Sequence, residues 1–170
     1  MPSSLTRRIS LFMAAALLLT GSAHALEIPA SKVVLSISGN ITRMNTGQQR
    51  ADFDMAMLAA LPQHSFTTMT PWYPEPKKFT GPLLRDVLAA VGAQGQTIKA
   101  VALNNFKVEV PVKDTQQFPV ILALLMDDKP MAIRNKGPLF IIYPFDTSIE
   151  LQSTLYYGRS AWQLRSIEVQ

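Results

Sequence analysis

The 170-residue chain contains no cysteine. Disulfides and thiolate-bound metal ions, which stabilise many small domains, are therefore ruled out as sources of stability. The fold must be held by packing alone, and a domain of this length buries roughly 70% of the surface that its extended chain exposes. That burial is sufficient for one hydrophobic core, so the length predicts a single domain.

The first 25 residues have the pattern of a secretory signal peptide. Arg7 and Arg8 precede the apolar run 9–19, and the triplet Ala23-His24-Ala25 matches a small-residue cleavage site. The apolar run is shorter than the ~20 residues that a membrane span needs. We therefore expect cleavage after Ala25, a mature domain over residues 26–170, a periplasmic location and no membrane insertion. An uncleaved N-terminal anchor is the alternative.

Charge and histidine content narrow the possible partners. Cleavage removes two arginines and no acidic residue, so the net charge falls from +4 to +2 in the mature chain. Such a small excess, without a basic run, does not indicate nucleic-acid binding. His64 is the one histidine after residue 25, so a metal site built from the usual nitrogen and sulfur ligands is not expected.

The hydrophobic pattern predicts strands and short helices in irregular order. Strands are expected over residues 33–41, 65–70, 98–103, 107–113, 139–144 and 163–169. Helices are expected over residues 55–61, 80–92 and within 148–162, whereas residues 120–125 fit either a strand or a short helix. Because no regular βαβ rhythm is present, the pattern indicates an α+β domain with a mixed β-sheet.

The segment "TGPLLRDVLAAVG" is the clearest helix of the chain. Thr80 is its expected cap, Pro82 suits the first turn, and Gly92 suits the C-terminal stop. Its apolar residues fall on one face and predict a core-facing stripe: Leu83, Leu84, Val87, Leu88 and Val91. Before the earlier helix, Asp52 and Asp54 are candidates for capping the free amides.

Common catalytic patterns do not occur. His64 and Ser65 are adjacent on a predicted strand, where neighbouring side chains point to opposite faces, so they cannot form a nucleophile–base pair. The chain has no GxSxG, GxGxxG, phosphate-binding loop or HExxH motif. The pair Asp127-Asp128 is typical of a solvated turn. We therefore expect no catalytic residue and no metal ligand.

The stretch "SFTTMTPWYP" at residues 65–74 suggests binding. It predicts a strand that ends at Pro71 and a rigid loop over residues 72–78, in which an indole and a phenol offer flat faces. Small-ligand sites combine such apolar surfaces with a few converging polar groups. The candidate ligand-binding residues are side chains that can stack on or hydrogen-bond to a flat ligand: Thr68, Thr70, Trp72, Arg134, Tyr143 and Asp146.

Structural roles are the alternative for these residues. Trp72 suits a partly buried packing position equally well, and Arg134 suits a surface turn. For the threonines, ordinary strand propensity is the simpler explanation. The segment "TPWYPEP" also fits a loop that docks on a partner protein, because Trp and Tyr are common interface anchors.

Four segments together resemble the molybdopterin-binding domain of the sulfite oxidase family. They are "FTGPLLRDVLAAVG", "AVALNNFKVEVPVKD", "LALLMDDKPMAIRNKGPLFIIYP" and "AWQLRSIEV", which occur in the order and spacing of that family. The resemblance as a whole covers about residues 66–169. The resemblance implies an α+β fold around a mixed sheet. It also implies, as one possibility, a molybdopterin-dependent oxidoreductase or a subunit of one, with the molybdenum cofactor bound.

The chain departs from that family at its metal ligand. The family carries a cysteine thiolate in the loop after the strand at residues 65–69, and this chain has "TPWYP" there. Asn135 stands where a histidine is expected, and Phe140 stands where an arginine is expected. Neither an indole nor a proline ring can replace a thiolate, so the resemblance does not predict molybdenum chemistry.

The chain is similar to small, exported, cysteine-free members of that fold, on the motifs "TPW", "RNKGPL" and "AWQLRSIEV". This resemblance implies a non-catalytic periplasmic protein that binds a free pterin. It further implies a partner, the periplasmic domain of a membrane-bound enzyme of cyclic di-GMP metabolism. In such a site Trp72 would stack on the pterin, Arg134 would bond to or stack with it, and Asp146 would accept from its 2-amino and N3–H edge.

Overall fold

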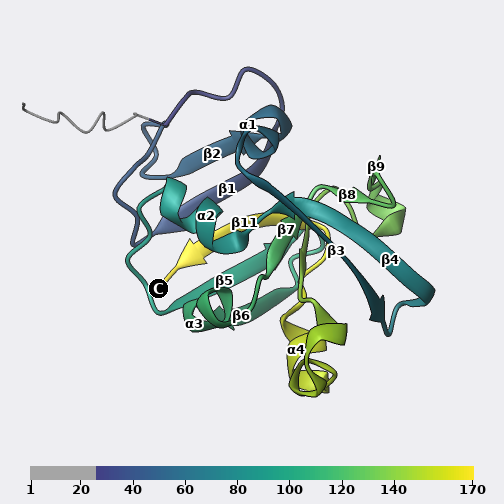
Figure 1. Ribbon diagram of the computed structural model, residues 1–170. Coiled ribbons are helices and arrows are strands. Elements are labelled where there is room, and N and C mark those ends of the chain that lie inside the picture. Colours follow the sequence, from purple (N-terminus) through teal and green to yellow (C-terminus); the bar gives the residue numbers. More distant parts are fainter. Residues whose placement is uncertain (1–25) are drawn as a thin grey trace, which may run out of the picture.

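The computed structural model describes residues 26–170, and their sheets and short helices confirm the predicted α+β class (Figure 1). The larger sheet has five strands in the order β2-β1-β11-β5-β6. These are β2 (Ala51–Asp54), β1 (Val33–Gly39), β11 (Leu164–Val169), β5 (Thr97–Ala102) and β6 (Lys107–Pro111). The sheet is mixed as predicted, because β1 and β11 run parallel whereas the other pairs are antiparallel.

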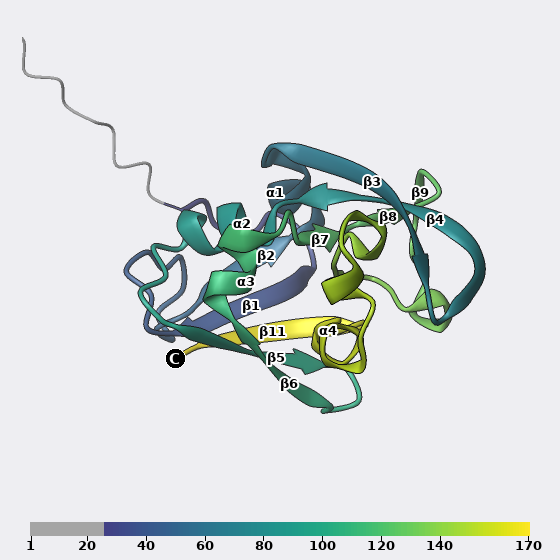
Figure 2. The same cartoon turned by 60° about the horizontal axis from the view of Figure 1, so that its bottom comes forward.

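One face of the five-stranded sheet is buried. Leu35 and Ile37 of β1 and Ile167 of β11 are fully buried, and they alternate with more exposed residues as the two-residue repeat of a strand requires. Figure 2 shows helices α1 (Met55–Ala60), α2 (Leu84–Ala90) and α3 (Val112–Gln117) together on that side of the sheet. The core therefore lies between this sheet and the helices.

A second sheet is built on a long hairpin. β3 (Gln63–Thr70) and β4 (Tyr73–Pro82) pair along their length, and the short strands β8 (Leu125–Met126) and β9 (Lys129–Pro130) extend the sheet. The predicted loop over residues 72–78 is therefore wrong. Pro74 and Pro76 fit the strand because the register shifts opposite Met69, between the pairs Thr70–Tyr73 and Thr68–Lys77. Ladder hydrogen bonds are interrupted at such an irregularity, which tolerates proline.

A third pair of strands shows that residues 120–125, whose pattern fits either a strand or a short helix, contain a strand. Residues 121–123 form β7 (Ile121–Ala123), which pairs antiparallel with β10 (Phe140–Ile142). All six residues are buried. The predicted apolar strand over residues 139–144 is thus confirmed in its central part.

Helix boundaries show where tertiary pairing overrides local signals. Asp54 caps α1 by accepting a 2.9 Å hydrogen bond from the Met57 amide, as predicted, and this bond lowers the pKa of Asp54. The predicted start of the next helix at Thr80 is wrong, because Thr80 pairs with Leu125 in the hairpin sheet. Helix α2 begins at Leu84 and is followed by Gly92, whose positive φ of 61° confirms the predicted stop.

The C-terminal third is more broken than predicted. The helix expected within residues 148–162 is a 3-10 turn, η3 (Ile149–Leu151), and one short helix, α4 (Thr154–Arg159). Two further 3-10 turns, η1 (Ile133–Asn135) and η2 (Phe145–Thr147), flank β10. No helix in residues 26–170 has both the length and the apolar character to cross a membrane.

A buried polar network ties α4 to the core. The Tyr143 hydroxyl donates a 2.9 Å hydrogen bond to Asp114, and the Arg159 guanidinium donates to the same carboxylate at 2.8 Å. Tyr143 is fully buried, and burial raises its pKa, with the Asp114 charge acting in the same direction. A buried carboxylate requires such partners, since water cannot replace them.

Replacing Tyr143 with Phe tests this network. The change removes one donor from the buried Asp114 carboxylate, and we expect the free energy of unfolding to fall by about 1–2 kcal/mol. Urea denaturation followed by circular dichroism measures the loss. Tyr73→Phe is the matched control, because Tyr73 is half-buried and donates only a long 3.4 Å bond to the Asn135 carbonyl. Equal stability of Y143F and the unaltered protein would contradict the role of the network.

Candidate functional site

Trp72 lies in the turn between β3 and β4 and is surrounded by four aromatic rings. The ring centroids lie at 5.5 Å for Phe140, 6.1 Å for Phe145, 6.1 Å for Tyr157 and 5.4 Å for Trp162, all in tilted or edge-to-face contact. We call these five residues the aromatic platform. Phe140 and Phe145 are buried, whereas the two tryptophans and Tyr157 are half-buried. The platform is therefore anchored in the core and reaches the surface.

A lysine lies on the exposed side of the platform. The Lys136 ammonium group is 3.9 Å from the ring centroid of Trp162 and 5.4 Å from that of Trp72. Both distances are within the range of cation–π attraction. Partial burial lowers the pKa of Lys136, because an ammonium group loses hydration there. The platform thus presents aromatic surface together with a hydrogen-bond donor on a long side chain.

Two contacts hold the turn that carries Lys136 in place. Lys136 ends η1 with a positive φ of 68°, and its carbonyl accepts a 2.9 Å hydrogen bond from the Gln163 amide. A side chain at Gly137 would collide with the Met131 carbonyl, so only glycine allows this close approach. The position of the ammonium group follows from this backbone.

Arg134 does not join the platform. It lies on η1, two residues before Lys136, and its side chain is exposed. Sequence reasoning selected Arg134 for its planar donor fork and missed Lys136, which provides the cation at the rings. The available signal was weak, because a Lys-Gly pair in a polar turn is usually solvated.

Thr68 and Asp146 are brought together, and each binds the backbone of the other segment. The Asp146 amide donates a 3.1 Å hydrogen bond to the Thr68 hydroxyl, and the Met69 amide donates a 2.7 Å bond to the Asp146 carboxylate. Thr68 is buried, whereas Asp146 is exposed. This reciprocal pair clamps strand β3 to η2, the turn that supplies Phe145 to the platform.

Thr70 and Tyr143 support the structure around the platform through hydrogen bonds within the protein. The Thr70 hydroxyl accepts a 3.3 Å hydrogen bond from the Trp72 amide and so fixes the hairpin turn. The prediction that Tyr143 binds a ligand is contradicted, because Tyr143 is fully buried and its hydroxyl donates a hydrogen bond to Asp114. Its ring stacks on Phe145 at 6.4 Å, so it supports the platform from below.

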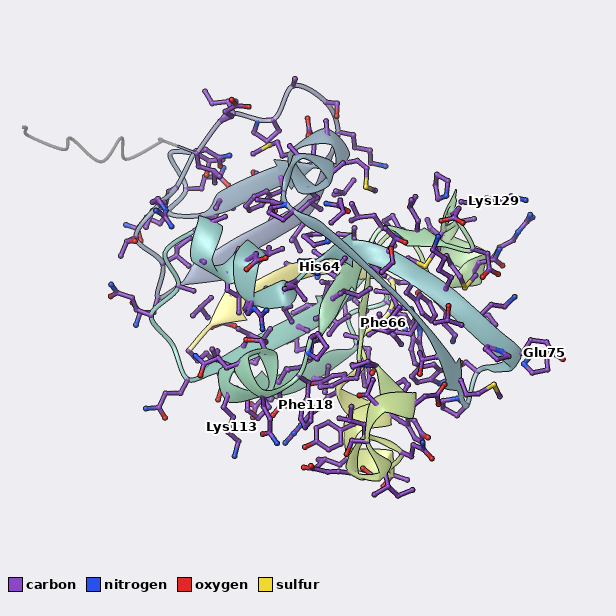
Figure 3. All side chains as sticks on the ribbon, viewed as in Figure 1. His64, Phe66, Glu75, Lys113, Phe118 and Lys129 are labelled. Atoms are coloured by element: carbon purple, nitrogen blue, oxygen red, sulfur yellow. The ribbon has the colours of Figure 1, made fainter. Side chains whose placement is uncertain are left out.

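Ser65, Asp127 and Asp128 have side-chain partners, whereas His64 is exposed on β3. The Ser65 hydroxyl pairs with that of Thr80 at 2.8 Å, and Figure 3 shows Glu75 at the outer end of the hairpin, away from His64. Asp127 and Asp128 form the tight turn between β8 and β9 and pair with Lys77 and Lys78. The lysine contact lowers the pKa of Asp127. The prediction of a solvated turn is confirmed.

The platform is partly exposed, through Trp72, Tyr157 and Trp162. Four hollows outlined within residues 26–170 have linings that include none of the five rings. Within the same residues, no cluster of three or more histidine, aspartate or glutamate side chains is arranged to hold a metal ion. The arrangement suits stacking and hydrogen bonding to a flat molecule more than enclosure of a bulky one.

Comparison with known proteins does not assign this chain to a family. No protein-family model matches the chain, and no curated protein is significantly similar to it in sequence.

The hydrogen bond from the Met69 amide to Asp146 should slow hydrogen exchange at this amide. Asp146→Ala removes its acceptor, and we expect hydrogen exchange at this amide to rise roughly fivefold, the equivalent of about 1 kcal/mol. NMR-detected exchange measures the effect. Asp146→Asn is the matched control, since its side-chain carbonyl still accepts the bond. An unchanged exchange rate in D146A would show that the clamp does not hold strand β3 in solution.

Proposed function

We propose that this chain is a non-catalytic binding protein for a flat, hydrogen-bonding heterocycle of the pterin class. The observation that carries the proposal is the aromatic platform with the Lys136 ammonium group 3.9 Å above the Trp162 ring. The Lys136 ammonium group covers half-buried aromatic rings. A planar molecule can displace this cation and stack on the same ring surface. Stacking on such rings contributes about 0.5–1.5 kcal/mol beyond the burial of apolar area.

Lys136 has a defined role in this proposal. Its long side chain swings away from the ring face when the heterocycle stacks on the exposed edge of Trp72 and Trp162. The ammonium group, already partly dehydrated, then donates a hydrogen bond to the 4-oxo group of the pterin. Arg134 lies outside the platform but is exposed in the same turn, so its long side chain would have to reach toward the ligand edge to supply a second donor.

Asp146 offers the complementary acceptor. One of its carboxylate oxygens accepts from the Met69 amide, and the side chain remains exposed next to the platform residue Phe145. Its other oxygen can accept from the 2-amino group and N3–H of a pterin. The clamp and the ligand contact are compatible, because an ionised carboxylate has lone pairs for several donors.

The signalling role of the chain is the wider part of the proposal. A signal peptide would deliver the domain to the periplasm, where it would report pterin occupancy to the periplasmic domain of a membrane-bound enzyme of cyclic di-GMP metabolism. The resemblance of "TPW", "RNKGPL" and "AWQLRSIEV" to exported pterin-binding proteins supports this assignment. Trp72 and Tyr73 at the hairpin turn would serve the partner as well as the ligand.

Titration with a reduced pterin tests the binding role. We expect a saturable quench of tryptophan fluorescence, an affinity roughly tenfold weaker in Trp72→Ala, and a smaller loss in Lys136→Gln. Phe106→Ala is the matched control, because Phe106 is an exposed aromatic residue at the far hairpin between β5 and β6.

Three outcomes would reject the proposal. The first is no saturable change, and the second is an affinity in W72A equal to that of the unaltered protein. The third is stoichiometric molybdenum in protein purified from its native compartment, which would favour the oxidoreductase alternative.

A further inference from the structure

A hollow of about 620 Å³ lies on the face of the five-stranded sheet opposite the buried Leu35, Ile37 and Ile167. It is bounded by the first residues of β1 and β11, by the end of β5 and by the turn that contains η1. Small-molecule sites are typically hollows of roughly 300–1,000 Å³, mostly apolar with a few placed polar groups. The size and the position make this hollow a candidate site distinct from the aromatic platform.

The wall of the hollow gathers exposed apolar side chains. Val33, Leu103 and Ile133 are 40%, 43% and 59% exposed, and all three line it. Fully buried Leu164 also contributes to the lining. Single apolar side chains on a surface need no explanation, but three that converge on one hollow indicate a contact with something apolar.

The charged groups of the lining all have one sign. Lys32, Arg50 and Arg165 line the hollow, and no acidic residue does. With three basic residues and no acidic residue in its lining, the hollow is locally positive. This charge attracts an anion and repels a cation.

The two arginines keep donors for a ligand. Arg50 is held through its Nε by the Asp52 carboxylate, which also accepts a 2.6 Å hydrogen bond from Ser36. Arg165 donates from one terminal nitrogen to the Asn105 side chain at 2.7 Å. Asp52 offsets one positive charge nearby, and the remaining guanidinium nitrogens match the oxygen pair of a carboxylate.

We propose that this hollow binds a small amphiphilic organic anion, a carboxylate with an aliphatic body. The carboxylate lies against the guanidinium and ammonium groups, and the aliphatic body covers Val33, Leu103 and Ile133. The site uses none of the five platform rings, so it stands independently of pterin binding. The turn at residues 133–138 borders both, because Ile133 and Pro138 line the hollow and Lys136 lies on the platform.

Calorimetric titration with octanoate, compared with 1-octanol as the neutral analogue, tests the proposal. We expect saturable binding of octanoate that weakens at high salt, and much weaker binding of the alcohol. The double variant Lys32→Gln with Arg165→Gln should lower octanoate affinity roughly tenfold or more. Ile133→Ser should also weaken it, through loss of apolar contact. Circular dichroism checks that each variant is folded.

Arg85→Gln is the matched control, since it removes one exposed positive charge from α2, outside the hollow. It should leave octanoate affinity unchanged, as should Trp72→Ala, which separates this site from the platform. The proposal is overturned if octanoate shows no saturable binding, if octanol binds equally well, or if R85Q reduces affinity as much as the double variant does. Loss of pterin binding with octanoate binding intact would reject only the function proposed for the platform.

Discussion

The packing of Trp72 against four aromatic rings from later in the chain fastens the β3–β4 hairpin to the rest of the domain. The β3–β4 hairpin projects from the body of the domain, and a chain without cysteine has no disulfide to fasten it. A tilted contact from β10 and edge-to-face contacts from η2, α4 and the segment before β11 meet the indole at the hairpin turn. Each such contact is weak, but together they fix the turn, and with it the surface on which a ligand would stack.

Polar contacts beneath and beside the rings give the platform a fixed shape. The reciprocal bonds of Thr68 and Asp146 hold β3 against η2, while Asp114 joins Tyr143 to Arg159 of α4. Hydrogen bonds fix the relative positions of these segments more strictly than aromatic packing does, because their strength depends on distance and angle. The platform thus combines packed aromatic rings with the long side chain of Lys136 above them. In the proposed binding mode only this lysine would have to move for a flat ligand to stack on the rings.

The turn at residues 133–138 places chemistry on two surfaces. Its lysine covers the aromatic platform, and its Ile133 and Pro138 border the cationic hollow on the five-stranded sheet. The turn is fixed by the αL backbone at Lys136 and by the close approach of Gly137 to Met131. A polar turn that looks ordinary in the sequence therefore connects two places where the domain exposes both apolar surface and positive charge.

Local patterns were sufficient for the α+β class, for most strands, for the Asp54 cap and for the stop at Gly92, because each depends on neighbouring residues. The extended Pro74 and Pro76, the start of α2 at Leu84 and the burial of Tyr143 depended on partners distant in the chain. For the same reason sequence selected Arg134 and missed Lys136. Residue type reveals what a side chain can do, but the backbone around residues 133–138 decides which cation reaches the rings. Tertiary structure alone brings Lys32, Arg50 and Arg165 to one hollow, since strand pairing, and not spacing along the chain, makes them neighbours.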